Sequence, residues 1–288
     1  FSTATGKLEL GPIRVHDGAV WDLAFSDDGR QIASGGDDGD VEVIDASTGE
    51  RVHSLAVSDL PVTSLLYDGQ RLITGGDDAM VRIWDGQALT DELRPQANSI
   101  TAMAIDPDGA LAVADRAGGV QILNLESGES EIELKAEENT IWGLSWSTDG
   151  RTLAAASADE RVQLWDVEEQ APIGSLGYPG GALDVAFLED GATIAATSGD
   201  GSVRLWDSSV LEPLGSALEG HSGKAVWRVV ALPGMRFASS SEGGTVHIWD
   251  VLNPNRACER AAGPLGIASL EAFLGDGEAR MACTDGDF

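Results

Sequence analysis

One five-residue pattern recurs six times along this chain of 288 residues, and it limits the folds that the chain can adopt. Each copy alternates aliphatic residues with others and ends in Asp or Asn. The copies are VEVID (41–45), VRIWD (81–85), VQILN (120–124), VQLWD (162–166), VRLWD (203–207) and VHIWD (246–250). Their last residues follow one another at intervals of 39 to 43 residues. A period of about 40 residues indicates one structural unit per copy, stabilised by stacking on its neighbours.

A second marker, a turn dipeptide after an apolar segment, has the same period. Asp-Gly favours a tight turn because both residues tolerate positive φ. The dipeptides are Asp28-Gly29, Asp68-Gly69, Asp108-Gly109, Asp149-Gly150, Asp190-Gly191, Pro233-Gly234 and Asp276-Gly277. Seven turns against six endings predict a seventh unit. Its missing part is expected from the other end of the chain, since FSTATGK (1–7) reads against IDASTGE (44–50).

Each copy contains four segments of strand length, which in the first copy cover residues 19–26, 31–34, 41–45 and 50–55. Four short antiparallel strands in about 40 residues are typical of a propeller blade. We therefore predict an all-β, seven-bladed β-propeller over residues 1–288, with the last blade closed by N- and C-terminal strands together. The blade cores are expected near residues 19–55, 62–95, 100–134, 141–176, 182–214, 226–262 and 267–288 plus 1–15.

The last copy leaves two questions open. A helical tail over residues 254–288 is the alternative to a seventh blade, because small residues recur there at helix-like spacing. These residues are Ala257, Cys258, Ala261 and Ala262. Cys258 and Cys283 lack CxxC spacing, so the sequence allows either two free thiols or one bridge between them.

The pattern resembles the WD-repeat β-propeller family over nearly the whole chain. The Trp-Asp endings, the period and a Gly-His element before the first strand carry this resemblance. That element is Gly220-His221 in the sixth copy and Val15-His16 in the first. The three apolar positions of the family's first strand are occupied by Val20, Leu23 and Phe25.

The resemblance implies a hydrogen-bonded tetrad of His, Ser or Thr, Asp and Trp in each blade, with structural roles only. The matching positions are His16, Ser34, Asp38, Thr74, Asp78, Trp84, Asp159, Trp165, Asp200, Trp206, His221, Ser239 and Trp249. No copy has all four residues. The first copy has Ile44 in place of Trp, and the sixth has Gly243 in place of Asp.

Residues that could support catalysis or bind a metal do not form a recognisable set. The histidines His16, His53, His221 and His247 lie in different copies, away from other ligands at metal-binding spacing. The run 37–40 lacks the residue order of a calcium loop and reads as a turn. We expect no catalytic residue, no metal and no cofactor.

Exposed aromatic positions indicate a binding surface instead. In WD repeats, the residue after the first apolar position of the innermost strand faces the top rim, where partners bind. Those positions include Trp21, Thr63, Thr101, Trp142 and Trp227, and turn carboxylates, Asp37 and Asp77, border them. Tryptophan beside carboxylates suits a protein or peptide that carries Arg or Lys among apolar residues. The alternative is that these tryptophans pack against neighbouring blades.

The net charge argues against nucleic acid and membrane surfaces as partners. Asp and Glu number 48 against 18 Lys and Arg, a formal net charge of −30, which disfavours nucleic acid and anionic membrane surfaces. No segment approaches the roughly 18 apolar residues of a membrane span. We expect a soluble chain, with the cytoplasm favoured. The resemblance allows one other role, as the sensor or regulatory domain of a larger enzyme such as a STAND-class NTPase or a protein kinase.

Overall fold

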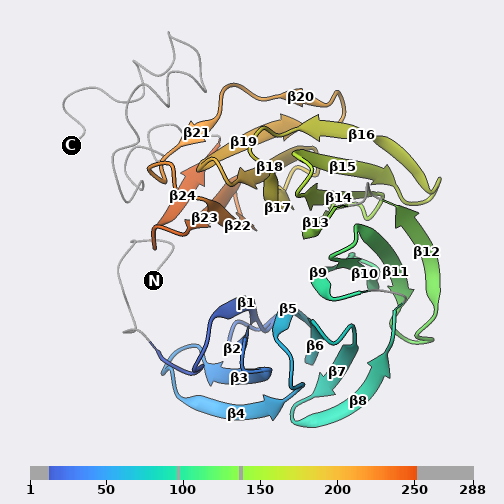
Figure 1. The fold of residues 1–288 in the computed structure, drawn as a ribbon, viewed down its shortest axis with the longest axis vertical. Helices are drawn as coiled ribbons and strands as arrows, with labels where there is room; N and C mark the ends of the chain where they lie inside the picture. The colour runs from blue at the N-terminus through green and yellow to red at the C-terminus, as the bar shows by residue number, and fades with distance from the viewer. Residues whose placement is uncertain (1–12, 96–97, 136–138, 252–288) are drawn as a thin grey trace. The chain divides into compact units, whose positions relative to one another are not determined.

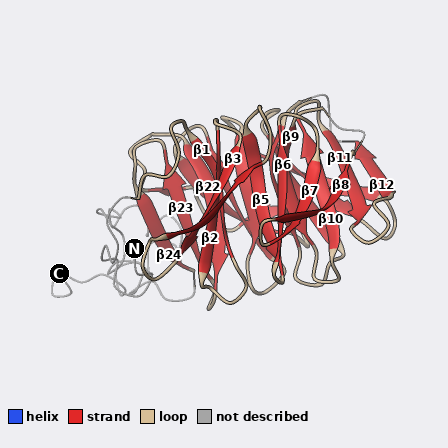
Figure 2. Cartoon of the chain, turned by 90° about the horizontal axis from the view of Figure 1, so that it is seen from below, coloured by secondary structure: helices blue, strands red, loops and turns tan. Residues whose placement is uncertain are grey.

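The computed structural model describes residues 13–95, 98–135 and 139–251. These residues form strands joined by turns and loops, and Figure 2 shows no helix among them. They divide into two compact units, the first ending at Ile141 and the second beginning at Trp142. In each unit the strands of a sheet follow one another in chain order, as Figure 1 shows for β1 to β4.

The first unit contains three antiparallel sheets of four strands. The first sheet consists of β1 (Val20–Phe25), β2 (Gln31–Gly36), β3 (Asp40–Asp45) and β4 (Arg51–Ala56). The second consists of β5 (Val62–Asp68), β6 (Arg71–Gly76), β7 (Val81–Asp85) and β8 (Ala88–Leu93). The third consists of β9 (Ile100–Ile105), β10 (Ala110–Asp115), β11 (Gly119–Asn124) and β12 (Ser130–Lys135). Each recurring five-residue segment therefore lies on the third strand of its sheet.

The second unit contains the other three sheets. The fourth sheet consists of β13 (Ile141–Trp146), β14 (Thr152–Ser157), β15 (Arg161–Asp166) and β16 (Ala171–Gly177). The fifth consists of β17 (Ala182–Phe187), β18 (Thr193–Ser198), β19 (Ser202–Asp207) and two short strands beside β19, β20 (Glu212–Pro213) and β21 (Leu218–Glu219). The sixth consists of β22 (Val226–Leu232), β23 (Arg236–Ser241) and β24 (Val246–Asp250).

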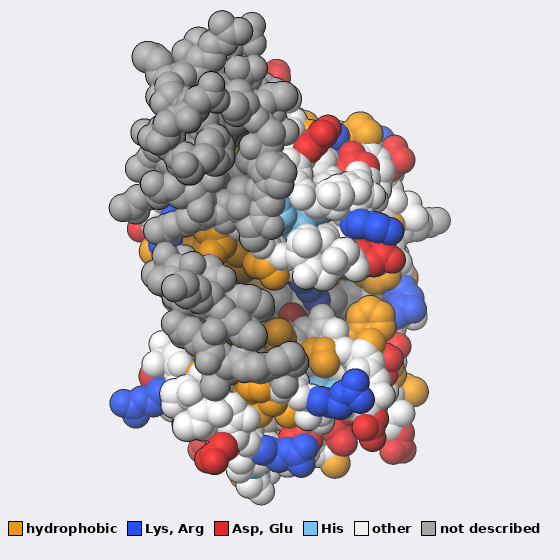
Figure 3. Space-filling model, turned by 90° about the vertical axis from the view of Figure 1, so that its left-hand side faces the viewer, with side chains coloured by type: hydrophobic (Ala, Val, Ile, Leu, Met, Phe, Trp, Pro, Cys, Tyr) orange, Lys and Arg blue, Asp and Glu red, His pale blue; other side chains and the backbone are white. Residues whose placement is uncertain are grey.

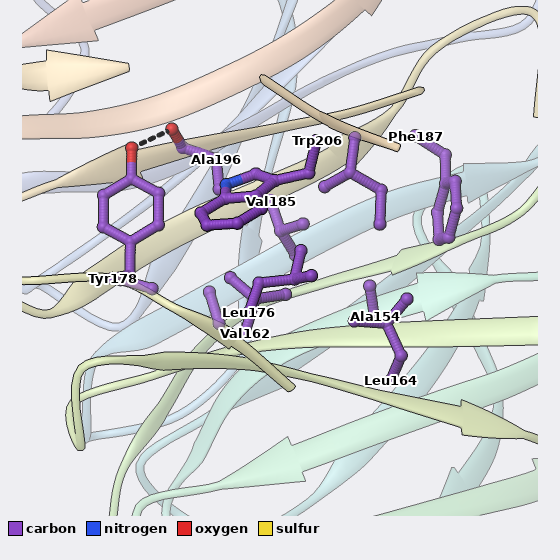
Figure 4. Packing of buried hydrophobic residues seen from close by; sticks show 12 residues of the cluster. Ala154, Val162, Leu164, Leu176, Tyr178, Val185, Phe187, Ala196 and Trp206 are labelled. Carbon is purple, nitrogen blue, oxygen red and sulfur yellow. Dashed lines mark hydrogen bonds between the residues drawn. The ribbon is translucent and has the colours of Figure 1, made fainter. Parts of the chain in front are cut away.

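Apolar side chains from neighbouring sheets form the cores. In the first unit, Val41 and Val43 of β3 belong to the same buried cluster as Val62 and Leu65 of β5. Figure 4 shows the cluster between the fourth and fifth sheets of the second unit, which includes Tyr178. Burial of one large aliphatic side chain contributes about 1.5–3 kcal/mol, so these contacts stabilise each pair of sheets.

Side chains from one sheet also accept hydrogen bonds from backbone N–H groups at the edge of the next sheet. The first strand of each sheet is an edge strand, so some of its N–H groups have no partner within the sheet. Asp22 Oδ2 accepts a hydrogen bond from the Leu65 N–H at 2.8 Å, and Ser64 Oγ accepts one from the Met103 N–H at 3.0 Å. The third position of the first strand therefore links the first sheet to the second and the second sheet to the third.

In the second unit, the third position of β13 is glycine, and an edge N–H of the following sheet is bonded in a different way. Asp184 Oδ2 accepts from the Val229 N–H of the sixth sheet at 2.9 Å. The preceding sheet has Gly143 at the equivalent position, which offers no side-chain acceptor to the Val185 N–H, whereas Ser145 Oγ accepts from the Phe187 N–H of β17 at 3.0 Å. Asp184 Oδ1 instead accepts from the N–H of Val185 in its own strand at 2.9 Å. One carboxylate thus serves two sheets, and the absent side chain at Gly143 leaves room for it.

Replacing Gly143 by alanine is expected to lower the free energy of unfolding by about 2 kcal/mol, because the added carbon overpacks this contact. A Cβ at position 143 would overlap Asp184 Oδ1 and lie 2.9 Å from Asp184 Cα. Urea unfolding followed by circular dichroism measures the change. Gly177→Ala is the matched control, since a Cβ there meets nothing within 4 Å and should alter stability by less than about 0.5 kcal/mol. Equal effects of the two substitutions would contradict the close packing of Gly143 against Asp184.

The prediction of seven blades, the last closed by strands from both ends of the chain, is wrong. Within the described residues the structure has six sheets, and the sixth has three strands. The seventh copy differs from the others in sequence, because it has the turn Asp276-Gly277 but lacks the five-residue segment ending in Asp or Asn that the other six copies contain. Residues 1–12 and 252–288, where the sequence places that blade and its helical alternative, lie outside the described residues, as do Cys258 and Cys283.

The side of β1 that the seventh blade was expected to cover is exposed. Val20, Leu23 and Phe25 are 46%, 62% and 62% exposed, whereas Val62 and Leu65 at the equivalent positions of β5 are 1% and 5% exposed. Figure 3 shows hydrophobic side chains at the surface of the side that it presents. The apolar pattern of β1 thus predicts a burial that the described residues do not provide.

Candidate partner-binding site

A buried histidine fastens the segment before β1 to the first sheet. His16 Nδ1 lies 3.0 Å from both carboxylate oxygens of Asp38, and His16 Nε2 lies 2.8 Å from Ser34 Oγ. An ionised carboxylate only accepts, so in the neutral ring Nδ1 carries the proton and the Ser34 hydroxyl donates to Nε2. Three tetrad positions are therefore joined in the first copy. They connect the segment before β1, strand β2 and the turn between β2 and β3.

The sixth sheet has a similar chain with a different last member. Trp249 Nε1 donates to Ser239 Oγ at 2.8 Å, and His221 Nε2 lies 2.8 Å from the same oxygen. His221 Nδ1 lies 2.9 Å from Thr245 Oγ1, so a hydroxyl replaces the carboxylate that Gly243 cannot supply. The spacing rule, six residues before Trp, did not find Thr245. The only sequence signal for this hydrogen bond was a hydroxyl residue close to Gly243.

His221 also packs against His247, with ring centroids 4.4 Å apart. Both imidazoles are buried, and His247 Nδ1 has no hydrogen-bond partner within the described residues. Burial, together with the neighbouring His247, lowers the pKa of His221 from 6.5 to about 4. Burial also lowers the pKa of His247. Both rings are therefore neutral at pH 7.

Acidic tetrad positions in two other copies pair with arginines. Trp84 Nε1 donates to Thr74 Oγ1 at 3.2 Å in the second sheet. Asp78 Oδ2 there accepts from Arg82 Nη1 at 2.6 Å. In the fifth sheet, Asp200 Oδ2 accepts from Arg204 Nη2 at 3.2 Å. These carboxylates have partners on the third strand, which the tetrad pattern does not include.

In the described residues of the fourth and fifth copies, no continuous chain of hydrogen bonds joins the tetrad residues. Trp165 and Trp206 are buried in the cores of their sheets. Asp159 Oδ1 and Trp206 Nε1 are buried without a hydrogen-bond partner in the described part of the chain. The position four residues before β17 holds Tyr178, as His16 precedes β1, and its hydroxyl donates to the Ala196 carbonyl at 2.5 Å. A tyrosine thus takes the place of a tetrad histidine, which the sequence analysis missed.

Trp21 and Asp37 form a contact at the surface of the first unit. The side chain of Trp21 is accessible, since the residue is 49% exposed. Its Nε1 donates to Asp37 Oδ1 at 2.5 Å, and the Ala19 N–H donates to Asp37 Oδ2 at 3.2 Å. A carboxylate has about four lone-pair sites, so Asp37 keeps acceptor capacity beyond these two bonds. The indole is therefore held in one orientation beside an acidic group.

The two predicted threonines donate hydrogen bonds from their hydroxyls to backbone carbonyls. Thr63 Oγ1 donates to the Ile100 carbonyl at 2.6 Å, and Thr101 Oγ1 donates to the Ile141 carbonyl. Thr63 therefore links the first strands of the second and third sheets. Both hydroxyls are used within the protein.

Asp77, the second predicted turn carboxylate, has two partners in the segments that flank β9 and β10 of the third sheet. Ser99 Oγ donates to Asp77 Oδ1, and Arg116 Nη2 donates to the same oxygen at 3.2 Å. The sequence analysis did not pair Arg116 with Asp77, 39 residues earlier. In the first unit, Asp37 and Asp77 thus differ in whether a cation of the protein neutralises them.

The other two predicted tryptophans belong to the second unit. Trp227 is 48% exposed, and Trp142 is half-buried at the start of β13. The adjoining Gly143 and Asp184 pack closely, as described above. Trp21 belongs to the first unit, so the predicted set is divided between the two.

A metal-binding group of side chains and a membrane-spanning helix are both absent from the described residues. Nowhere among them do three His, Cys, Asp or Glu side chains come together in a way that could hold a metal ion. The part of the chain covered by the structure also contains no helix with the length and apolarity needed to cross a membrane.

The repeated four-stranded sheets, the Trp-Asp strands and the linked tetrad residues define a WD-repeat β-propeller. Such propellers are typically non-catalytic, and the architecture is that of a protein-interaction scaffold. The chain belongs to the family described as the IFT122 first beta-propeller, whose model matches residues 2–250.

One relative among curated proteins is Periodic tryptophan protein 2 of Arabidopsis thaliana. It is 26% identical to this chain over 173 residues. The aligned region covers 57% of this chain and 19% of the relative. The chain therefore matches about a fifth of that protein's length.

Proposed function

We propose that this chain is a non-catalytic scaffold that binds a protein or peptide segment on the surface that carries Trp21 and Asp37. The observation that supports the proposal is the accessible indole of Trp21, fixed by its hydrogen bond to Asp37. A fixed aromatic side chain loses little conformational entropy when a partner binds, which favours its use as an anchor.

The chemistry of this contact favours a basic partner. An arginine can stack on the indole face and donate to the free acceptor sites of Asp37 at the same time. The net charge of −30 attracts basic segments over longer distances. We therefore infer that the partner segment carries an arginine or lysine flanked by apolar residues. Trp142, Trp227, Thr63, Thr101 and Asp77 stay predictions for the same binding role.

Trp21→Ala is expected to weaken binding of such a segment about 30-fold, since removal of an aromatic anchor costs about 2 kcal/mol. The probe is an array of synthetic peptides with one arginine in a Leu/Ser/Gly background, followed by calorimetry on the tightest binders. Asp37→Asn keeps an acceptor for Trp21 but removes the charge. It should weaken binding mainly at low ionic strength, because salt screens exposed charges.

Leu89→Ala is the matched control, because Leu89 is an exposed apolar residue on the outer strand β8. Its binding should equal that of the wild type. The proposal is overturned if the wild-type chain shows no arginine-dependent binding, or if Trp21→Ala and Asp37→Asn bind as the wild type does. The role as a regulatory domain of a larger enzyme stays a prediction, which the sequence upstream of this chain in its gene would test.

A further inference from the structure

The first two sheets present their acidic turn residues in the same way. We call Asp37 and Asp77 the acidic turn positions. The N–H of Asp37 donates to the Ala19 carbonyl at 2.9 Å, and the N–H of Asp77 donates to the Pro61 carbonyl at 3.0 Å. Each bond joins the turn after the second strand to the segment before the first. The two carboxylates therefore leave equivalent backbone positions at the same end of neighbouring sheets.

Arg116 occupies the corresponding turn of the third sheet, and its backbone is held on both sides. Its N–H donates to the Ser99 carbonyl at 3.1 Å, and its own carbonyl accepts from Thr140 Oγ1 at 3.0 Å. From this fixed turn the guanidinium reaches back to Asp77 Oδ1 at 3.2 Å. The basic residue therefore lies where the first two sheets have acidic residues.

The two acidic turn positions consequently differ in charge. Asp37 accepts from Trp21 and from the backbone, and among the described residues no cation forms an ion pair with it. Asp77 is bonded by Ser99 and neutralised by Arg116, whose side chain is about half-exposed. A partner that places one cation at Asp37 and a second near Asp77 would meet the positive charge of Arg116.

We propose that Arg116 is a specificity-determining residue, which fills the Asp77 position and so selects partner segments with one basic residue over segments with two. This proposal rests on the proposed function, because it requires that a basic residue binds at Trp21 and Asp37. The selectivity comes from repulsion of a second cation and from competition for Asp77. The half-exposed Arg116 side chain makes the exclusion graded rather than absolute.

The test compares two series of nine-residue peptides in one Leu/Ser/Gly background. One series carries a single arginine, and the other carries a second arginine two to five residues away. In Arg116→Ala, affinity for the best peptide with two arginines should rise up to about fivefold, as expected for an exposed ion pair, while affinity for the single-arginine peptide stays within about twofold. Arg116→Lys, which keeps the charge, should behave as the wild type does.

Arg30→Ala controls for net charge, because it removes one cation from the same unit at the turn between β1 and β2. It should leave the preference between the two series unchanged. The inference is overturned if Arg116→Ala leaves the preference unchanged, or if it weakens binding of the single-arginine peptide. Failure of the proposed function is distinguishable, since the wild-type chain would then bind neither series, or would bind both regardless of Trp21.

Discussion

Replacing Tyr178 by alanine is expected to lower the free energy of unfolding by about 4 kcal/mol, the largest effect of any single substitution that we consider. Tyr178 is fully buried in the cluster between the fourth and fifth sheets. Its hydroxyl donates to the Ala196 carbonyl, and the Arg204 guanidinium lies 4.7 Å from the ring centre. Alanine would leave a cavity and remove both contacts.

Urea unfolding followed by circular dichroism measures this loss. Tyr178→Phe separates the contribution of ring packing from that of the hydrogen bond, because phenylalanine keeps the ring and removes the hydroxyl. That variant should lose only about 1 kcal/mol. An unfolding midpoint of Tyr178→Ala equal to that of the wild type would show that Tyr178 is not part of a packed core.

Acidification is expected to destabilise the sixth sheet between pH 6.5 and 4. The pKa of His221 is about 4 in the folded protein and 6.5 when unperturbed, so the unfolded chain binds the proton more tightly in this range. Stability is therefore lost as the pH falls below 6.5. From pH 7.5 to 4.5 the contribution of His221 is between about 2 and 3 kcal/mol. Nuclear magnetic resonance titration of the His221 ring, with urea unfolding at both pH values, measures it.

Thr245→Asp provides the decisive comparison for this pH effect. A carboxylate beside His221 Nδ1 favours the protonated ring and raises its pKa, so the loss of stability on acidification should shrink. Thr245→Val, which removes the hydroxyl without adding charge, should not reduce that loss. A His221 pKa near 6.5 in the wild type, with equal acid sensitivity in all three proteins, would contradict the prediction.

The sequence predicted the repeated sheets well because their signal is local. The alternation in VRIWD and the Asp-Gly turns report strand faces and hairpins, which depend on neighbouring residues. The all-β propeller class is confirmed. The seventh blade was inferred from one turn with its flanking segment (272–284) and from a likeness between the chain ends, without a seventh copy of the five-residue segment. The error thus arose where the local signal was incomplete.

Contacts between sheets could not be predicted from the same pattern. Arg116 reaches Asp77 across 39 residues, and Thr245 replaces an acid that the spacing rule places at Gly243. Period and alternation identify which face a side chain occupies but not which neighbour it contacts. For the same reason the sequence did not predict that the hydroxyls of Thr63 and Thr101 donate to backbone carbonyls.

The shared use of Asp184 has a consequence for how such arrays change by duplication or exchange of repeats. A glycine at 143 and an aspartate at 184 form a compatible pair, because the carboxylate occupies the space that a side chain at 143 would need. Transplanting the fourth repeat alone, in front of a repeat without this aspartate, would leave the N–H at the Val185 position of its new neighbour without this acceptor. The exchangeable module in this part of the chain is therefore a pair of adjacent repeats, which a chimera of residues 141–214 would carry intact.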